Sequence, residues 1–454
     1  MKNNSIYKKA LKLAVPMMIQ NGITNAVGLV DNIMVGSLGT ESITAVSIAG
    51  QLIFVFNLAI FGGLSGPGIY GAQYYGHGDT EGVKGIFRLK FWIGLFCAIA
   101  GILVFVFAGD ALIRRYLAGE GSDIDPMLTL KYSRQYLDIM LIGFLPFTIT
   151  QIYAGSLRET DESVKPMVAG IASVVVDVLF NYLLIYGKFG LPRLEVRGAA
   201  IATVISRFVE MSVVVIWSHK RRDIHIFLKG IYKTLKVPVD MTKKVLPKSF
   251  PIFINEFLWA GGLAVLTQIY SKRSLDVIAG LNISNAICNL LNVVFVTLGS
   301  AVGIIIGQQL GASEYEKAKK NSVKLMWFTS AVCVLLTIIL VSISGVFPKI
   351  YNTTDLVRDY ATKFIIITAL FFPIQGFLNT LYFTLRSGGK TVITFLFDSG
   401  FSWVVSVPVA YIICTFTGLP ILWIYATIQA LDIIKVVVGY VLIKKGIWIT
   451  NLVE

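Results

Sequence analysis

Charged residues are scarce in this sequence, and that scarcity excludes most soluble architectures. Only 15% of the 454 residues are Asp, Glu, Lys or Arg, whereas soluble domains carry about 25%. Hydrophobic residues make up 55% of the chain, and the mean hydropathy is +0.73. This composition predicts an all-α protein that crosses a lipid bilayer several times.

Cysteine and histidine are also rare. The four cysteines, Cys97, Cys288, Cys333 and Cys414, stand singly in apolar segments, without disulfide or metal spacing. The chain has three histidines, and its sequence contains neither HExxH nor GxSxG. We therefore expect no enzyme, no metal centre and no organic cofactor.

The net charge of +14 could indicate a nucleic-acid partner. The basic residues, however, lie in short connections between apolar runs. That distribution is typical of membrane proteins, so we expect contact with the bilayer and none with nucleic acid.

Apolar windows of about 20 residues predict twelve membrane-spanning helices. They cover residues 13–35, 44–72, 87–108, 132–157, 165–187, 198–217, 248–271, 277–308, 320–343, 360–386, 392–415 and 420–443. Most Lys and Arg residues fall on one side if the N-terminus is cytoplasmic. The positive-inside rule then places both termini in the cytoplasm, with the protein in the cell membrane.

The longest inner connection is rich in Lys and Arg, with apolar residues such as Ile224, Phe227 and Ile231 between them. This pattern predicts a basic linker attracted to anionic lipid. We divide the chain into an N-terminal six-helix lobe at 1–218, a cytoplasmic linker at 219–247 and a C-terminal six-helix lobe at 248–454.

The two halves repeat each other at a fixed offset of 235 residues. The matching pairs are Pro16 and Pro251, Asn57 and Asn292, Gly68 and Gly303, Gln73 and Gln308, and Gly76 and Gly311. Each half has six spans, so the copies share one orientation in the membrane. Parallel repeats of this kind are a transporter architecture.

Asp31 lies in an apolar run without Lys, Arg or His between Leu13 and Gly36. A lone carboxylate in lipid costs about 2.5–3.5 kcal/mol on insertion scales, so it is expected to face a protein interior or water. Asp177 and Asn181 share one helix face at a similar depth. The three side chains could form an oxygen-lined cation site or share a proton between two acids.

A second pair of intramembrane acids is Glu256 and Asp398, each about eight residues into its span. The repeat makes their helices the partners of the helices that carry Asp31 and Asp177, so we expect Glu256 and Asp398 to face each other. A structural role for any of these acids is the alternative.

Several segments resemble the multidrug and toxic compound extrusion (MATE) family. They are VDNIMVG, GAQYYG, LRETDESVKP, NYLLIYGKFGLP and GAAIAT in the first half, and PIFINE, GQQLG and LRSGG in the second. The resemblance covers nearly the whole chain and implies a V-shaped arrangement of two six-helix lobes. It also implies cation-driven export of organic compounds by alternating access.

The resemblance assigns residues as well. It implies a cation-coupling site at Asp31, Asp177 and Asn181, and a functional acid at Glu256, where the family has a Pro-x4-Glu spacing. Glu256 and Asp398 are then the candidate substrate or second cation site. H⁺ is the preferred coupling ion, because two desolvated acids at one depth repel each other. Na⁺, bound at Asp31, Asp177 and Asn181, is the alternative.

We expect a monomeric antiporter that exports cationic, amphipathic compounds, and three other functions are alternatives to it. A lipid-linked precursor flippase of the wider superfamily is the nearest, although the acidic intramembrane residues disfavour it. An intramembrane enzyme is disfavoured because the sequence shows no nucleophile or metal constellation. A receptor is disfavoured because it would not need the twofold repeat. The identity of the substrate does not follow from the sequence.

Overall fold

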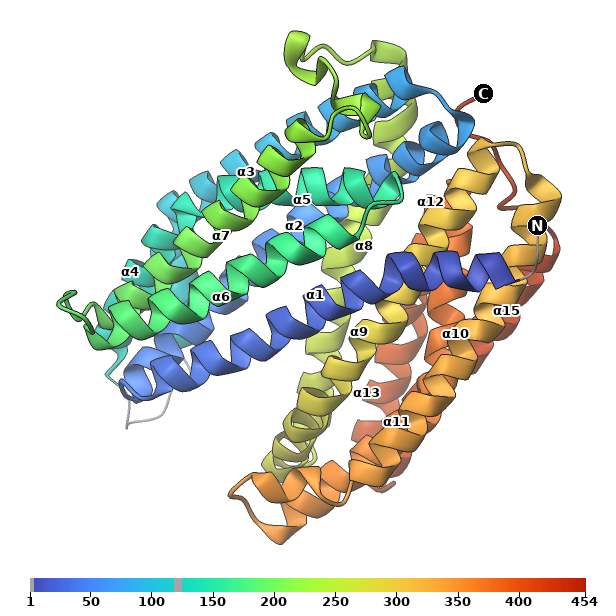
Figure 1. Cartoon of the computed structure of the whole chain (residues 1–454). Coiled ribbons are helices and arrows are strands. Elements are labelled where there is room, and N and C mark those ends of the chain that lie inside the picture. The colour runs from blue at the N-terminus through green and yellow to red at the C-terminus, as the bar shows by residue number, and fades with distance from the viewer. Residues whose placement is uncertain (1–3, 118–124) are drawn as a thin grey trace. The chain divides into compact units, whose positions relative to one another are not determined.

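The computed structural model describes residues 4–117 and 125–454 (Figure 1). Within these ranges the chain is helical and contains no strand. The long helices of the first half are α1 (Asn4–Gly36), α2 (Thr40–His77), α3 (Thr80–Leu117), α4 (Pro126–Ile142), α5 (Phe144–Glu159), α6 (Val164–Tyr186) and α7 (Glu195–Lys220). The α-helices of the second half are α8 (Val239–Ser271), α9 (Leu275–Gly311), α10 (Tyr315–Ile343), α11 (Asp355–Ser387), α12 (Thr391–Phe395), α13 (Val407–Phe416), α14 (Ile421–Ala430) and α15 (Asp432–Lys444).

The described residues contain eleven candidate spans, and a bent pair of helices makes a twelfth. That pair is α4 and α5, which meet at 48°, where the sequence predicts one helix over 132–157. The bend follows from Pro146, which lacks the N–H that would continue the hydrogen-bond ladder. At the break, Gly143 donates its N–H to Met140 O at 2.9 Å, and its carbonyl accepts from Arg207 Nη1 at 3.3 Å.

A second irregularity interrupts the predicted helix 392–415. The backbone there is π-helical over η4 (Leu396–Gly400) and η5 (Ser402–Ser406), between α12 and α13. π-Helical turns are rare overall, and those that occur often lie at functional sites. Asp398, a predicted site residue, lies in the π-helical segment η4.

The chain forms two compact units. The first contains the residues up to Met18, Ala72–Asp79 and Val245–Glu454, and the second contains Ile19–Gly71 and Thr80–Lys244. Helix α1 therefore begins in the first unit and ends in the second. The predicted lobe boundaries at 218 and 248 stay a prediction.

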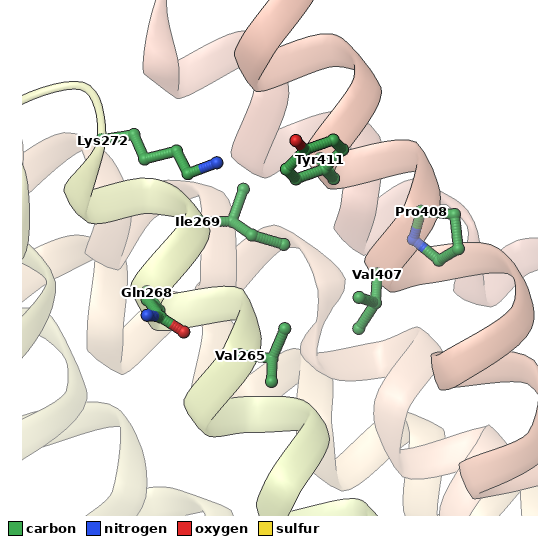
Figure 2. A pocket seen from close by; sticks show the side chains of 7 residues that line it. All are labelled: Val265, Gln268, Ile269, Lys272, Val407, Pro408 and Tyr411. Carbon is green, nitrogen blue, oxygen red and sulfur yellow. The ribbon is translucent and has the colours of Figure 1, made fainter.

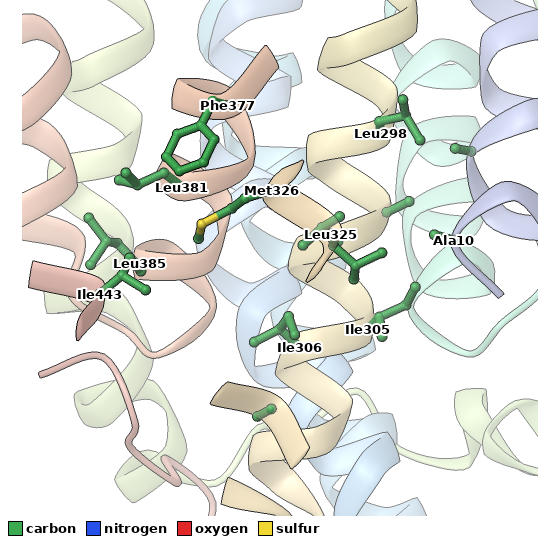
Figure 3. Close-up of a cluster of buried hydrophobic side chains, with 14 of the residues drawn as sticks. Ala10, Leu298, Ile305, Ile306, Leu325, Met326, Phe377, Leu381, Leu385 and Ile443 are labelled. Atoms are coloured by element: carbon green, nitrogen blue, oxygen red, sulfur yellow. The ribbon is translucent and has the colours of Figure 1, made fainter. Parts of the chain in front are cut away.

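One apolar core of the first unit is built by α1, α9, α10, α11 and α15 (Figure 3). Ala10 and Leu13 of α1 are buried beside Leu298 and Ile305 of α9 and Leu381 of α11. Repeat-related segments at the ends of α2 and α9 also meet in this unit. A Cβ on Gly76 would overlap the Gln308 backbone, and one on Gly311 would overlap the Gln73 backbone, so glycine is required at both repeat-related positions.

Residues 226–233 of the predicted basic linker form a folded strap in the second unit, whereas residues 239–247 belong to α8. The strap contains two short 3₁₀ turns, η1 (Ile226–Leu228) and η2 (Ile231–Lys233). Phe227 and Ile231 are buried, and Ile231 O accepts from Arg88 Nε of α3 at 3.2 Å. Ile224 remains exposed. The interleaved apolar residues that the sequence assigns to a lipid interface are thus partly used to hold the strap on α3.

Candidate functional site

The first polar site joins the three residues predicted from the sequence: Asp31, Asp177 and Asn181. Asn181 Nδ2 donates to Asp31 Oδ1 at 2.8 Å and to Asp177 Oδ2 at 3.2 Å. Asp177 and Asn181 are 5% and 1% exposed, and Asp31 is half-buried. A single amide nitrogen therefore bridges two carboxyl groups from α1 and α6.

Local packing fixes the two helices that carry this site. Val35 of α1 is buried with Ile185 of α6 and Ala199 of α7. One turn beyond Asn181, Tyr186 Oη lies 3.0 Å from Ser37 Oγ. Gly198 allows α7 to approach α6, since a Cβ there would press on the Leu184 backbone. The site is thus held between three helices rather than carried on a loop.

Two oxygens of the first polar site have no hydrogen-bond partner among the described residues. They are Asp177 Oδ1 and Asn181 Oδ1, and both are buried. An unsatisfied buried oxygen costs about 1–3 kcal/mol and calls for a physical reason. A proton on the carboxyl group or a bound cation would supply a partner.

A second polar site forms around Asp398, in the first unit. Asn255 Nδ2 donates to Asp398 Oδ2 at 2.9 Å, and Asn255 Oδ1 accepts from Ser399 N at 3.3 Å. Ser399 Oγ in turn donates to Asn255 O at 3.0 Å. Asn255 of α8 thus holds the π-helical turn η4 and orients the carboxyl group of Asp398.

Glu256 and Asp398 are close enough to interact electrostatically, with Arg386 also in range of Glu256. Both acids are half-buried. The hydrogen-bond partner of Asp398, however, is Asn255 and not Glu256. The structure therefore brings the two predicted acids into one neighbourhood and adds a buried guanidinium to it.

Sequence reasoning missed Asn255 and its counterpart Gln20. The repeat offset of 235 relates these two residues, and each ties its helix to another. Gln20 Oε1 accepts from Arg158 Nη2 at 2.8 Å, and Gln20 Nε2 donates to Glu210 at 3.3 Å. The signal was available, because both residues are polar, stand inside apolar spans and share one position in the repeat.

Two spans carry oppositely charged residues three positions apart, a spacing at which an intrahelical ion pair can form: Arg207 and Glu210 in α7, and Asp432 and Lys435 in α15. Lys435 Nζ lies 2.8 Å from Asp432 Oδ1, as expected for residues three apart. Arg207 and Glu210 make no such pair within the described part of the chain. Arg207 instead bonds Gly143 O and lies 4.9 Å from the Phe147 ring centroid, because the broken span α4–α5 presents it with a carbonyl and an aromatic face.

A hollow of about 500 Å³ lies elsewhere in the first unit, between α8 and α13 (Figure 2). Val265, Ile269, Val407 and Pro408 form its apolar wall. Lys272 Nζ lies 4.3 Å from the Tyr411 ring centroid at its rim. Val265 is nine residues along α8 from Glu256, about 14 Å, so this hollow is separate from the second polar site.

Comparison with known proteins decides the family. A family model described as MatE matches residues 16–183 and again 251–412. This chain belongs to the MatE family. The two matches begin at Pro16 and Pro251, the repeat-related prolines.

The curated relatives of this MatE chain carry matching names. A probable multidrug resistance protein, YoeA of Bacillus subtilis, is 26% identical, over 99% of this chain and 96% of its own length. Another, NorM of Thermotoga maritima, is 24% identical, over 92% of this chain and 88% of its own length. The MatE chain is therefore a multi-pass membrane protein of the multidrug efflux family.

Solved structures agree on the fold. An outward-facing multidrug resistance MATE transporter superposes with a TM-score of 0.87 at 17% identity, covering 99% of this chain and 97% of that one. A transporter of the MOP superfamily from Pyrococcus furiosus gives 0.87 at 18%, with the same coverage. The predicted all-helical MATE architecture is confirmed.

Proposed function

We propose that this MatE protein is a secondary antiporter in the cell membrane that exports organic cations in exchange for protons. The observation that carries the proposal is the first polar site. It places two carboxyl groups of a membrane-spanning region on one amide nitrogen, Asn181 Nδ2. Two carboxyl groups that accept from the same nitrogen are close neighbours, and close carboxyl groups favour sharing one proton over holding two negative charges.

The orientation of Asn181 favours H⁺ over Na⁺. Na⁺ requires several oxygen ligands at once, yet the amide presents its nitrogen to both Asp31 and Asp177. A sodium site would need the amide to rotate, whereas a shared proton needs no rearrangement. The free oxygens of Asp177 and Asn181 are the observation that keeps Na⁺ as the second candidate.

Loading and release of the ion would act on the packing of α1 against α6. A proton changes the charge of the first polar site and so changes its free energy in the two access states by different amounts. The second polar site supplies a partner for the cationic group of the substrate through Glu256. A carboxylate in a region of low dielectric is poorly screened, so its attraction for a cation is strong.

Transport in proteoliposomes tests the proposal. An inward-directed proton gradient should drive export of a cationic dye without Na⁺. Asp31→Asn and Asp177→Asn, which keep the side-chain volume, should reduce this export at least tenfold in folded protein. Asp110→Asn is the matched control, because Asp110 is exposed. Export that requires Na⁺ and persists after the pH gradient is collapsed would replace the proton by sodium.

A further inference from the structure

Half of the exposed positions of helix α9 are carboxamides, although the helix is apolar enough to span a membrane. Asn282, Asn285 and Asn289 are exposed, and spacings of three and four residues place them on one face. Asn292 continues the row one turn further and donates Nδ2 to Asn289 Oδ1 at 3.2 Å. The row is ten residues long, about 15 Å.

The span α3 shows what an apolar, lipid-facing surface looks like in this protein. Between residues 91 and 109 of α3, the exposed side chains are Trp92, Phe96, Ile99, Leu103, Val104, Val106 and Phe107. All of them are apolar. A bare carboxamide in hydrocarbon would lose its hydrogen bonds, so the carboxamide face of α9 belongs against water or another polar surface.

The repeat reproduces the exposure of this face and part of its polarity. The exposed positions of α9 are 282, 285, 286, 289, 290 and 296, and the positions 235 residues earlier on α2 are exposed as well. On α2 the polar members are Ser47 and Gln51, whereas the large side chains of Phe54, Val55 and Phe61 are apolar. Ser47 and Gln51 line a hollow of about 420 Å³ together with Thr44 and Tyr116. The equivalent face therefore borders open space in the second unit.

Helix α1 carries a comparable row beside the first polar site. Asn21, Asn25 and Asn32 are exposed at spacings of four and seven residues. Asp31, which binds Asn181, is next to Asn32 in the chain and half-buried. Uncharged carboxamides thus accompany the candidate coupling acid on the helix that carries it.

We propose that the carboxamide row of α9, Asn282, Asn285, Asn289 and Asn292, is a binding surface for the uncharged polar groups of the transported compound. A carboxamide both donates and accepts hydrogen bonds and carries no charge. The row therefore recognises hydroxyl, carbonyl and amide groups, while a charged group must find its partner elsewhere. The substrates are organic molecules with one hydrogen-bonding face; this rests on the proposed export function.

Accessibility is the first test and needs no transport. In a chain whose four native cysteines are replaced, single cysteines at Asn282, Asn285 and Asn289 should react with a water-soluble methanethiosulfonate much faster than cysteines at Phe96 and Leu103. Equal rates would overturn the proposal, because the row would then face lipid. Oxidative cross-linking of Asn285→Cys between two copies would also overturn it, by showing a helix–helix contact instead.

Ligand protection is the second test, and it separates the substrate class from the transport mechanism. Doxorubicin, a cation rich in hydroxyl and carbonyl groups, should protect Asn285→Cys from the reagent. Tetraphenylphosphonium, a cation without hydrogen-bonding groups, should not. Equal protection by both compounds, or protection by neither, would overturn the assignment of the row.

Export completes the comparison. Replacing Asn282, Asn285 and Asn289 together by Ala should lower the ratio of doxorubicin export to tetraphenylphosphonium export about tenfold. Leu290→Ala and Val296→Ala, at apolar exposed positions of the same helix, should change that ratio less than twofold. An unchanged ratio in the triple variant would refute the row. If the native protein exports neither compound, the antiport proposal fails while accessibility and protection still decide the row.

Discussion

At the residue scale, two asparagines organise the acids of this protein. Asn181 bridges Asp31 and Asp177 in the second unit, and Asn255 holds Asp398 in the first. An amide can donate to a carboxylate without adding charge, so it orients the acid and leaves it free to gain a proton or a cation. Each acid is thus positioned by a neutral neighbour from another helix or another turn.

Glu256 gives a prediction at this scale. Glu256→Gln keeps the volume and removes the charge, so it should weaken binding of cationic compounds about tenfold or more and leave neutral ones nearly unchanged. Binding to purified protein by fluorescence quenching measures both. Glu81→Gln serves as the control, because Glu81 is exposed and the same charge is removed there. Equal losses for both classes of compound would indicate a structural role for Glu256.

At the scale of elements, close helix contacts depend on single glycines. Gly76 closes α2 and Gly311 closes α9, and both lie in the first unit. Each occupies a place where a methyl group would overlap the partner's backbone. Backbone cannot move aside as a flexible side chain can, so these crossings tolerate no larger residue.

Gly76→Ala and Gly311→Ala should each lower the free energy of unfolding by about 1–3 kcal/mol through overpacking. The apparent melting temperature in detergent measures the loss. Gly345→Ala serves as the control, because a Cβ at Gly345 would meet nothing within 4 Å. Melting temperatures that are equal in all three variants would contradict this account of the crossing.

The strap over 226–233 gives a pH prediction. His225 beside it is buried and lies 5.3 Å from the Trp217 ring centroid. Burial lowers the pKa of His225 below its usual value, against the opposing charges of Glu162 and Asp223. Below about pH 6.5, His225 therefore binds a proton more readily when the strap is undocked than when it is docked.

Docking of the strap should accordingly be intact above pH 6.5 and weaken as the pH falls towards the lowered pKa of His225. Amide hydrogen exchange over residues 225–231 reports it, corrected for the intrinsic effect of pH. His225→Gln removes the titration and should make protection independent of pH between about 5 and 7. If protection from hydrogen exchange in His225→Gln still depended on pH, a group other than His225 would cause the change in docking.

At the scale of the whole molecule, the duplicated sequence appears again in burial and in family matches. The MatE model matches the chain twice, from Pro16 and from Pro251. Every exposed position of α9 corresponds to an exposed position of α2 at the same offset of 235. The two copies nevertheless differ in chemistry, with paired acids in one and an acid clamped by Asn255 on π-helical backbone in the other.

The orientation of the chain in the membrane is a prediction at this scale. A cysteine at the exposed Lys229 should react with an impermeant thiol reagent only after cells are opened, because the basic strap is expected on the cytoplasmic side. A cysteine at the exposed Phe189, in the connection expected outside, should react in intact cells. The reverse pattern would invert the topology.

The sequence by itself determined the spans, the repeat and the first polar site. Apolar windows and the positive-inside bias are properties of composition, and they need no knowledge of contacts. Asp31, Asp177 and Asn181 stood out because polar side chains in lipid-length apolar runs are costly, and a spacing of four fixes a shared helix face.

Only the tertiary structure decided the rest. The roles of Gln20 and Asn255, the π-helical backbone at Asp398 and the docking of the strap all depend on partners distant in sequence. Local propensity carries no information about such partners, because their contribution appears only when packing removes water from both. The carboxamide face of α9 is the intermediate case: its spacing was present in the sequence, but its exposure is a property of the fold.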